Sequence, residues 1–336
     1  MSENETVPTL RISGPADLLQ GVPYLLGFHP AESLVLIGLA DGQLVVTVRV
    51  DLVDLVEPDV LADALEAMRR GGTDTVVAAV YDDSPRTSPL PWNGVARMVR
   101  EECERCGCEL ADVLRVAGGR WWSYECSSWA CCPPEGKELP GAPSPFVAAA
   151  TYAGLVALPD RDSLSAQLDP LPDLARATLE PMIAEQERAV VAAVLDGAGG
   201  RTERSLKRTL FAAARAADRS RPAAALGDRD AARFAVALSG TGMRDSVWMA
   251  VDDRRLDGRE LWRDLARRVP APYDAAPLFL FGWACWRAGH GALAGIAAQR
   301  AIDSDPTYSA ADLLLAALAR GLDPRQLPRL RLSRSA

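Results

Sequence analysis

The stretch SLVLIGLADGQLVVTVRVDL, residues 33–52, holds two apolar runs on either side of Asp41-Gly42. After its serine the first run, 33–39, is continuously apolar, which is typical of a strand buried on both faces. In the second run apolar residues recur at every second position, at Leu44, Val46, Val48 and Val50. This period indicates a strand with one buried face, and an Asp-Gly pair favours a two-residue turn. The stretch therefore predicts a β-hairpin.

The segments that follow alternate between helical and strand patterns. We expect, in order, a helix from Pro58 to Gly71-Gly72 with Leu61, Leu65 and Met68 on one face, a buried strand at 75–83, and a second helix from near Trp92. Residues 109–126 are expected to form two strands around Gly118-Gly119. The resulting order, ββαβαββ, predicts a mixed sheet with helices packed on it, which is an α/β domain.

The pattern changes near residue 170, where helical spacing replaces the strands. We therefore predict an α/β domain over residues 8–165, with a Trp/Cys-rich loop, and an all-α helical domain over 166–328. Within the helical domain, the helix pair near 273–306 places Gly282, Ala294, Ala301 and Pro306 where a tetratricopeptide unit has glycine, alanine, alanine and proline. The pair resembles one such unit, and a generic helical bundle is the alternative.

Composition limits the class of protein. The 336 residues are 49% hydrophobic and 24% charged, as in a globular protein of two domains. The chain has no apolar run of about 18 residues, so we expect no membrane span. The start, MSENETVPTL, has neither the basic flank nor the apolar stretch of a secretory signal. We therefore expect a cytoplasmic protein whose seven cysteines stay reduced.

Charge is distributed unevenly along the chain. Residues 1–165 contain 24 acidic and 12 basic residues, net −12, and the remainder contains 21 and 25, net +4. The acidic first half argues against nucleic-acid binding there. The second half has one basic stretch, 201–221, with seven basic and two acidic residues. A solvated helix face or a nucleic-acid contact would each explain it.

Motifs for phosphate, dinucleotide or metalloprotease chemistry are absent from the sequence. The chain has two histidines, and His29, directly before Pro30 and a buried strand, is the better candidate for a functional role than His290 in a glycine turn. The acidic pairs Asp82-Asp83 and Asp252-Asp253 could bind a cation, although such pairs in loops are usually solvated. Asp82-Asp83 follows a strand, where α/β sheets often bind ligands.

Six of the seven cysteines lie between residues 103 and 132. Cys103 and Cys106 follow helical spacing, so we expect them in a helix core. Cys126, Cys131 and Cys132 form a candidate metal site, because zinc takes thiolate ligands in a tetrahedral arrangement. A fourth ligand would come from Cys108, a histidine or a partner. A reactive thiol and simple packing are the alternatives. We expect no cofactor, with zinc at these three cysteines as the alternative.

The same segment is rich in aromatic residues. Trp121, Trp122, Tyr124 and Trp129 lie within nine residues, and such residues are favoured in contacts with partners. Together with His29 they form a candidate binding surface. Alternatively, they cover the end of the sheet against the helical domain. Period-two alternation places Trp122, Tyr124 and Cys126 on one face of a strand.

Three segments point to a known family: GVPYLLGFHPAESLVLIGL (21–39), GRWWSYECSSWACCPPEG (119–136), and the helices from Trp283 to Tyr308. Together they resemble the actinobacterial family known as domain of unknown function 4192. The resemblance implies a bacterial, cytosolic protein. It assigns no activity and no catalytic residue.

The function expected from these observations is non-catalytic. We expect a cytoplasmic bacterial protein that binds a macromolecular partner, favouring a protein over a nucleic acid, through its helical domain or its Trp/Cys loop. One alternative is an enzyme whose site combines His29, Asp82-Asp83 and the Cys126–Cys132 loop. Another is a nucleic-acid-linked regulator that uses the basic stretch 201–221 and the tail from Pro328.

Overall fold

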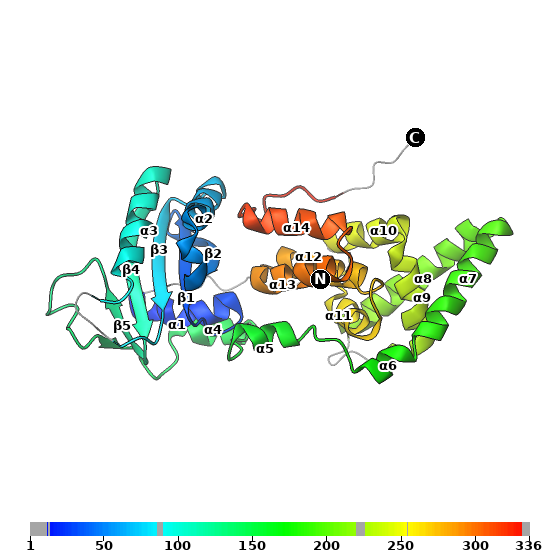
Figure 1. The fold of residues 1–336 in the computed structure, drawn as a ribbon, viewed down its shortest axis with the longest axis horizontal. Helices are drawn as coiled ribbons and strands as arrows, with labels where there is room; N and C mark the ends of the chain where they lie inside the picture. Colours follow the sequence, from blue (N-terminus) through cyan, green and yellow to red (C-terminus); the bar gives the residue numbers. More distant parts are fainter. Residues whose placement is uncertain (1–11, 13, 86–89, 220–225, 254, 331–336) are drawn as a thin grey trace, which may run out of the picture. The chain divides into compact units, whose positions relative to one another are not determined.

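The computed structural model describes residues 12, 14–85, 90–219, 226–253 and 255–330. The chain forms two compact units, an N-terminal unit of residues 1–164 with 319–323 and a helical unit of residues 165–318 with 324–336. The start of the predicted first domain, residues 8–11, the end of the basic stretch, 220–221, and the tail beyond residue 330 lie outside the described residues. The predicted fold class, an α/β domain followed by an all-α domain, is confirmed (Figure 1).

The N-terminal unit contains a mixed six-stranded sheet in the order β2-β1-β3-β4-β5-β6. The strands are β1 (Ser33–Ala40), β2 (Gln43–Asp51), β3 (Thr75–Tyr81), β4 (Glu109–Ala117), β5 (Arg120–Ser123) and β6 (Lys137–Glu138). Strands β3 and β4 are parallel, and every other neighbouring pair is antiparallel. The predicted hairpin is present, and Asp41 and Gly42 have φ values of 51° and 72°, as a two-residue hairpin turn requires.

Two helices on one side of the sheet form the main core of this unit. They are α2 (Pro58–Arg70), at the predicted position, and α3 (Asn93–Cys106). Their apolar faces, including Leu61, Leu65 and Val99, pack against strand residues such as Leu36 and Ala78. The amphipathic spacing in the sequence predicted this face correctly.

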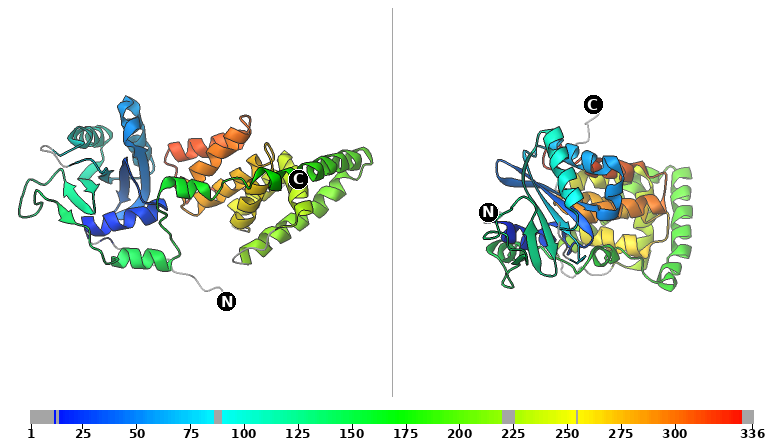
Figure 2. Two further views of the ribbon diagram at one scale, coloured as in Figure 1. Left: turned by 60° about the horizontal axis from the view of Figure 1, so that its bottom comes forward. Right: turned by 60° about the vertical axis from the view of Figure 1, so that its left-hand side comes forward.

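The opposite side of the sheet carries two helices that the sequence patterns did not predict. They are α1 (Pro15–Leu26) and α4 (Pro145–Tyr152), which pack against one another (Figure 2). A short 3-10 helix, η1 (Leu52–Val56), and the two-residue strand β6 were also not predicted. Burial of β1 on both faces follows from this arrangement, because helices cover the sheet on both sides.

The helical unit is built around one fully buried helix. Its helices are α6 (Asp173–Ala177), α7 (Glu180–Leu195), α8 (Gly199–Arg219), α9 (Asp228–Ser239), α10 (Thr241–Asp252), α11 (Arg259–Arg268), α12 (Ala275–Arg287), α13 (Gly291–Ser304) and α14 (Ser309–Ala319); α5 (Arg161–Ala166) spans the boundary. Every residue of α12 from 275 to 286 is buried. Helices α9, α10, α11 and α13 surround it, which explains why α12 is apolar on all sides.

The helix pair α12–α13 occupies the position of the predicted tetratricopeptide-like unit. A Cβ atom on Gly282 would lie 3.1 Å from the Ala294 carbonyl oxygen, so the two helices approach closely there. Ala294 and Ala301 are buried on α13, and Asp305-Pro306 follows the end of that helix. The spacing of small residues thus reflects close helix packing.

The expectation that the pair Asp252-Asp253 is solvated is wrong for Asp252. It is the last residue of α10 and its carboxylate is buried. The Arg287 guanidinium lies 2.5 Å from its Oδ1, the Trp283 indole N–H donates to it at 2.9 Å, and the Leu330 amide donates to Oδ2 at 2.5 Å. The carboxylate therefore links α10, α12 and the C-terminal segment.

Of the described helices, none combines the length and the apolar composition that crossing a membrane requires.

Candidate functional site

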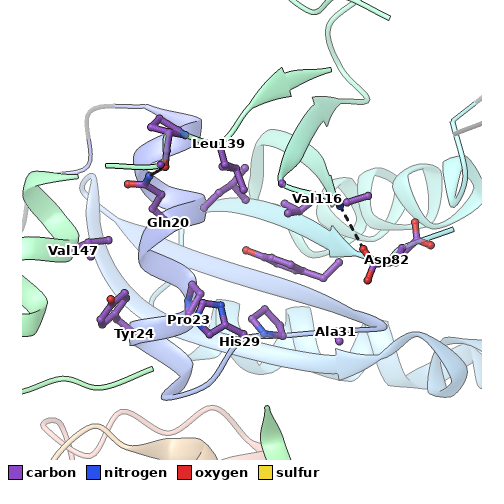
Figure 3. Close-up of a pocket in the computed structure, with 18 of the residues that line it drawn as sticks. Gln20, Pro23, Tyr24, His29, Ala31, Asp82, Val116, Leu139 and Val147 are labelled. Atoms are coloured by element: carbon purple, nitrogen blue, oxygen red, sulfur yellow. Dashed lines mark hydrogen bonds between the residues drawn. The ribbon is translucent and has the colours of Figure 1, made fainter. Parts of the chain in front are cut away.

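One candidate site is a cavity of about 500 Å³ at the carboxyl ends of the parallel strands β3 and β4. We call it the sheet-edge pocket. Its lining comes from α1, the segment before β1, the ends of β3 and β4, and residues 139–143, and it includes Tyr24, His29, Glu32, Tyr81, Asp82 and Asp83. Figure 3 shows Tyr24 and His29 along one side and Val116 and Leu139 along the other. Ligands of α/β domains commonly bind at this edge of a sheet.

Asp82, which lines the pocket, belongs to a buried ion pair. Asp82 Oδ2 lies 2.9 Å from Arg115 Nε, and both side chains are 1% exposed. The Ser84 amide donates to Asp82 Oδ1 at 2.6 Å, and Arg115 also donates to the Ser84 carbonyl. Burial raises the pKa of Asp82, but hydrogen bonds from Ser84 and Arg115 outweigh it and hold that pKa below its usual value. The expectation of a solvated Asp82-Asp83 pair is therefore wrong for Asp82, whose carboxylate is committed to Arg115.

Tyr81 is a site residue that the sequence patterns did not identify. It is the last residue of β3, it lines the pocket, and it is 8% exposed. Its hydroxyl has no hydrogen-bond partner among the described residues, and burial raises its pKa. A buried hydroxyl without a partner is costly, which makes Tyr81 a candidate for contact with a ligand. The only signal in the sequence is a tyrosine that ends a run of small aliphatic residues.

The segment before β1 brings His29 and Glu32 to the rim of the same pocket. The His29 amide donates to the Leu158 carbonyl at 2.9 Å, which fixes this segment. Glu32 has φ of 43°, a left-handed conformation that costs energy for a residue with a side chain. Such strained residues cluster at functional sites. His29 and Asp82-Asp83 are thus brought together, as the enzyme alternative requires.

The formal charges that line the sheet-edge pocket are negative. Glu32, Asp82 and Asp83 contribute carboxylates, and the Asp82 charge is balanced by its ion pair with Arg115, which does not line the pocket. Among the described residues that line the pocket there is no lysine or arginine. The pocket therefore favours a cation or a hydrogen-bond donor over an anion.

The three loop cysteines lie in a different cavity. Cys126, Cys131 and Cys132 line a second pocket of about 410 Å³, together with Asp112, Lys137, Trp121 and the start of α1. Their sulfur atoms all lie within 4.8 Å of one another. The structure thus brings the three cysteines together, but it places them in another pocket from His29 and Asp82-Asp83.

The course of the cysteine loop differs from the predicted strand. β5 ends at Ser123, so Trp122, Tyr124 and Cys126 do not alternate along one strand face, and that prediction is wrong. The strand ends because the Ser123 hydroxyl oxygen accepts the amides of Glu125 and Cys126, both at 3.1 Å. The same hydroxyl donates to Asp112 at 2.7 Å.

The surroundings of the three thiols differ from one another. Hydrogen bonds to the Ser128 backbone and the Cys132 side chain lower the pKa of Cys126. Burial raises the pKa of Cys132 to about 11. Lys137 Nζ lies 3.8 Å from Cys131 Sγ. A proton can therefore leave one thiol of the cluster more easily than another.

The other cysteines are structural. Cys103 is buried on α3 and Cys106 packs beside it against the core, as predicted from their spacing. Burial raises the pKa of Cys103 to about 12. Cys108, one predicted source of a fourth metal ligand, is buried with its sulfur 3.7 Å from the Thr73 carbonyl oxygen, and it is not part of the lining of the cysteine pocket.

The aromatic residues of the loop do not form one surface. Trp121 and Trp122 are buried, and the Trp122 indole N–H donates to the Pro134 carbonyl at 3.0 Å. Tyr124 is half-buried and donates to the Pro91 carbonyl. Trp129 is 78% exposed. Of the predicted binding surface, Trp129 and His29 are the exposed members.

The remaining sequence candidates lie in the helical unit. His290 precedes α13 and is half-buried, and burial lowers its pKa. The described part of the basic stretch forms α8, which buries Leu210, Ala214 and Ala217 and exposes arginines on its other side. This pattern is compatible with a solvated helix face and with a nucleic-acid contact.

Comparison with known proteins gives one family. No curated protein and no solved structure matches the chain. A family model described as "Domain of unknown function (DUF4192)" matches residues 15–325, which cover most of both units and, except for Gly14, all the residues that line the two pockets. The chain belongs to the DUF4192 family.

Proposed function

We propose that the N-terminal unit is a binding module for a small, positively charged molecule, which it holds in the sheet-edge pocket. The observation that carries the proposal is Tyr81, a residue that lines the cavity and whose buried hydroxyl has no hydrogen-bond partner among the described residues. A ligand acceptor or donor would satisfy this group. The family resemblance and the free state of all seven cysteines favour the bacterial cytoplasm as its location.

Charge indicates the class of ligand. Glu32 and Asp83 are exposed at the rim and can accept hydrogen bonds from an ammonium or guanidinium group. Tyr24 and Tyr81 supply aromatic rings, which attract cations. Binding is favoured over catalysis because the candidate nucleophiles, Cys126, Cys131 and Cys132, line the other pocket.

The test uses a panel of primary amines, guanidinium compounds and quaternary ammonium compounds. Carboxylates and phosphates of similar size serve as anionic controls. Thermal shifts at constant ionic strength select binders, and calorimetry gives their affinities. A cation that occupies the pocket at 100 times its Kd should stabilise the folded chain by about 2.7 kcal/mol. The anions should produce no shift.

Two variants separate binding from stability. Tyr81→Phe should weaken cation binding about 10-fold, yet leave the unliganded protein as stable as the wild type or more so, because it removes a buried hydroxyl without a partner. Tyr152→Phe, at a 92% exposed tyrosine outside the pocket, is the matched control and should change neither. Equal affinity of Tyr81→Phe and wild type would refute the proposal.

An exposed apolar surface supports a second function, binding of a protein partner by the helical unit. Near its end α7 exposes Val190, Val191, Val194 and Leu195, the last of these 81% exposed. Adjacent exposed apolar side chains of this kind mark interaction surfaces. A Val191→Asp/Val194→Asp double variant should lose a cross-linked protein that the wild type retains, with unchanged helical content by circular dichroism. Val156→Asp, at an exposed valine of the other unit, is the control.

A further inference from the structure

We propose that Cys126, Cys131 and Cys132 bind one zinc ion through three thiolates, with the fourth coordination position open to the cavity they line. Their sulfur atoms lie within 4.8 Å of one another. In a tetrahedral site with Zn–S bonds of about 2.3 Å, two sulfurs are about 3.8 Å apart. The ion would therefore need each pair of sulfurs to close by about 1 Å at most.

The backbone of the loop directs the three thiols to one point. The amides of Cys131 and Cys132 both donate to the Ser128 carbonyl, at 3.0 and 2.6 Å. The Cys126 amide donates to the Ser123 hydroxyl at 3.1 Å. The tight turn after Ser128 folds two adjacent cysteines back towards Cys126, so that neighbours in sequence can share one ion.

The loop is also anchored at its far end. The Trp122 indole donates to the Pro134 carbonyl, and Arg120 donates to the Gly136 carbonyl at 2.9 Å. Gly136 has φ of 77° and lies so close to Trp122 that a Cβ atom would be 2.4 Å from its ring. These contacts hold the loop in place before an ion binds, which reduces the entropy that binding must overcome.

The charges around the cluster suit a zinc–thiolate centre. Zinc with three thiolates carries a net charge of −1. The Lys137 ammonium, one of two lysines in the chain, lies 3.8 Å from Cys131 Sγ and compensates this charge. The ammonium also lies over the Trp121 ring, with Nζ 5.1 Å from the ring centre. This contact keeps the ammonium near the sulfurs.

A water molecule best fills the fourth position. Among the described residues, no histidine, aspartate, glutamate or fourth cysteine has a ligand atom within 4.8 Å of all three sulfur atoms. Asp112 lines the same cavity and accepts a hydrogen bond from Ser123, so it can receive a proton or a hydrogen bond from that water. Sites with three protein ligands and an open position are those in which zinc can bind an exchangeable molecule.

The test is the metal content of the full-length chain, produced with added zinc and purified without a chelator, measured by plasma mass spectrometry. We expect about one zinc ion per chain. Cys126→Ser, Cys131→Ser and Cys132→Ser should each weaken zinc binding by about 100-fold or more, because removing a ligand costs at least as much as removing its supporting residues. Cys106→Ser, at a half-buried cysteine of α3, should keep the zinc.

A second measurement uses the wild-type protein, so it tests the proposal even if the serine variants do not fold. Modification of thiols in the native wild type should release zinc in step with the reaction of three cysteines. Cobalt in place of zinc should give thiolate-to-metal charge-transfer absorption. Absence of bound metal with three freely reactive thiols would overturn the proposal. A disulfide among the three, or full zinc retention by all three serine variants, would overturn it as well.

Discussion

At the scale of single residues, the ion pair between Asp82 and Arg115 has the largest consequence for the sheet-edge pocket. Both groups are buried, and Asp82 follows Tyr81 at the end of β3. A buried charge is tolerated only when paired, and loss of its partner costs about 3–5 kcal/mol. The pair thus fixes the position of the residues that line the pocket. Two of these residues are themselves in unfavourable states, because Glu32 has a left-handed backbone conformation and the buried Tyr81 hydroxyl has no partner among the described residues.

We predict that Asp82→Asn destabilises the protein by about 3–5 kcal/mol at pH 7, because Arg115 is left buried without a counter-charge. The folded-state pKa of Asp82 is lowered. Its contribution is therefore present above the unfolded pKa of about 3.9 and is lost as the pH falls through the folded pKa. Denaturant unfolding of wild type and variant should give a difference that shrinks below about pH 4.

The control for this measurement is Asp83→Asn, at the neighbouring exposed carboxylate. It should change the free energy of unfolding by no more than about 0.5 kcal/mol. A difference between Asp82→Asn and wild type that stays constant from pH 7 to well below 4 would contradict the assigned role of the ion pair.

At the scale of secondary-structure elements, close approach of helices determines the centre of the helical unit. A Cβ atom at Gly282 would lie 3.1 Å from the Ala294 carbonyl oxygen, 3.2 Å from Ala297 and 3.2 Å from Leu314. Helices α12, α13 and α14 therefore meet at one glycine. Small residues at such a point are required by packing, whether or not the pair belongs to a repeat array.

We predict that Gly282→Val destabilises the helical unit by about 1–3 kcal/mol, because added methyl groups overpack this contact. Gly295→Val is the matched control on α13, where the nearest atom to an added Cβ is 3.7 Å away. Thermal unfolding should give a lower melting temperature for Gly282→Val than for Gly295→Val. Equal melting temperatures would show that the helices can move apart without cost.

At the scale of the whole molecule, two compact units share one chain, and the C-terminal segment contributes to both. Residues 319–323 belong to the N-terminal unit and residues 324–336 to the helical unit. In the helical unit, Asp252 holds the C-terminal segment through the Leu330 amide. Arg287 adds a second attachment, because it donates to the carbonyls of Pro324 and Leu327.

We predict that Asp252→Asn weakens the helical unit and leaves the N-terminal unit intact. The variant removes the charge that pairs with Arg287, at a cost of about 3–5 kcal/mol. Hydrogen exchange should accelerate in α10, α12 and residues 324–330, while α2 and α3 keep their protection. Faster exchange throughout both units would show instead that the two unfold together.

The sequence patterns predicted the elements that local physics controls. The hairpin at 33–51, helix α2 and strands β3 and β4 follow from apolar period and turn residues, and each lies where expected. Helices α1 and α4 were not predicted. α1 contains Pro23 and has buried residues around much of its surface, so it lacks the single apolar face that indicates a helix.

The candidate sites depended on contacts between residues distant in the chain. The burial of Asp82 needs Arg115, which lies 33 positions away. The strand that should have carried Tyr124 and Cys126 stops at Ser123 because one hydroxyl accepts two backbone amides. A sequence pattern contains neither fact, since each depends on which side chains meet after folding.

The sequence by itself determined the fold class, the order of the central elements and the family of this protein. Apolar periodicity and turn chemistry, which act over a few residues, determined the fold class and the order of the elements, whereas the family followed from the resemblance of three sequence segments. Only the tertiary structure decided that His29 and Asp82-Asp83 share one pocket, that three cysteines gather in another, and that Tyr81 faces a cavity. Those outcomes depend on how the sheet and its loops converge in space, and burial and unpaired polar groups become defined only there.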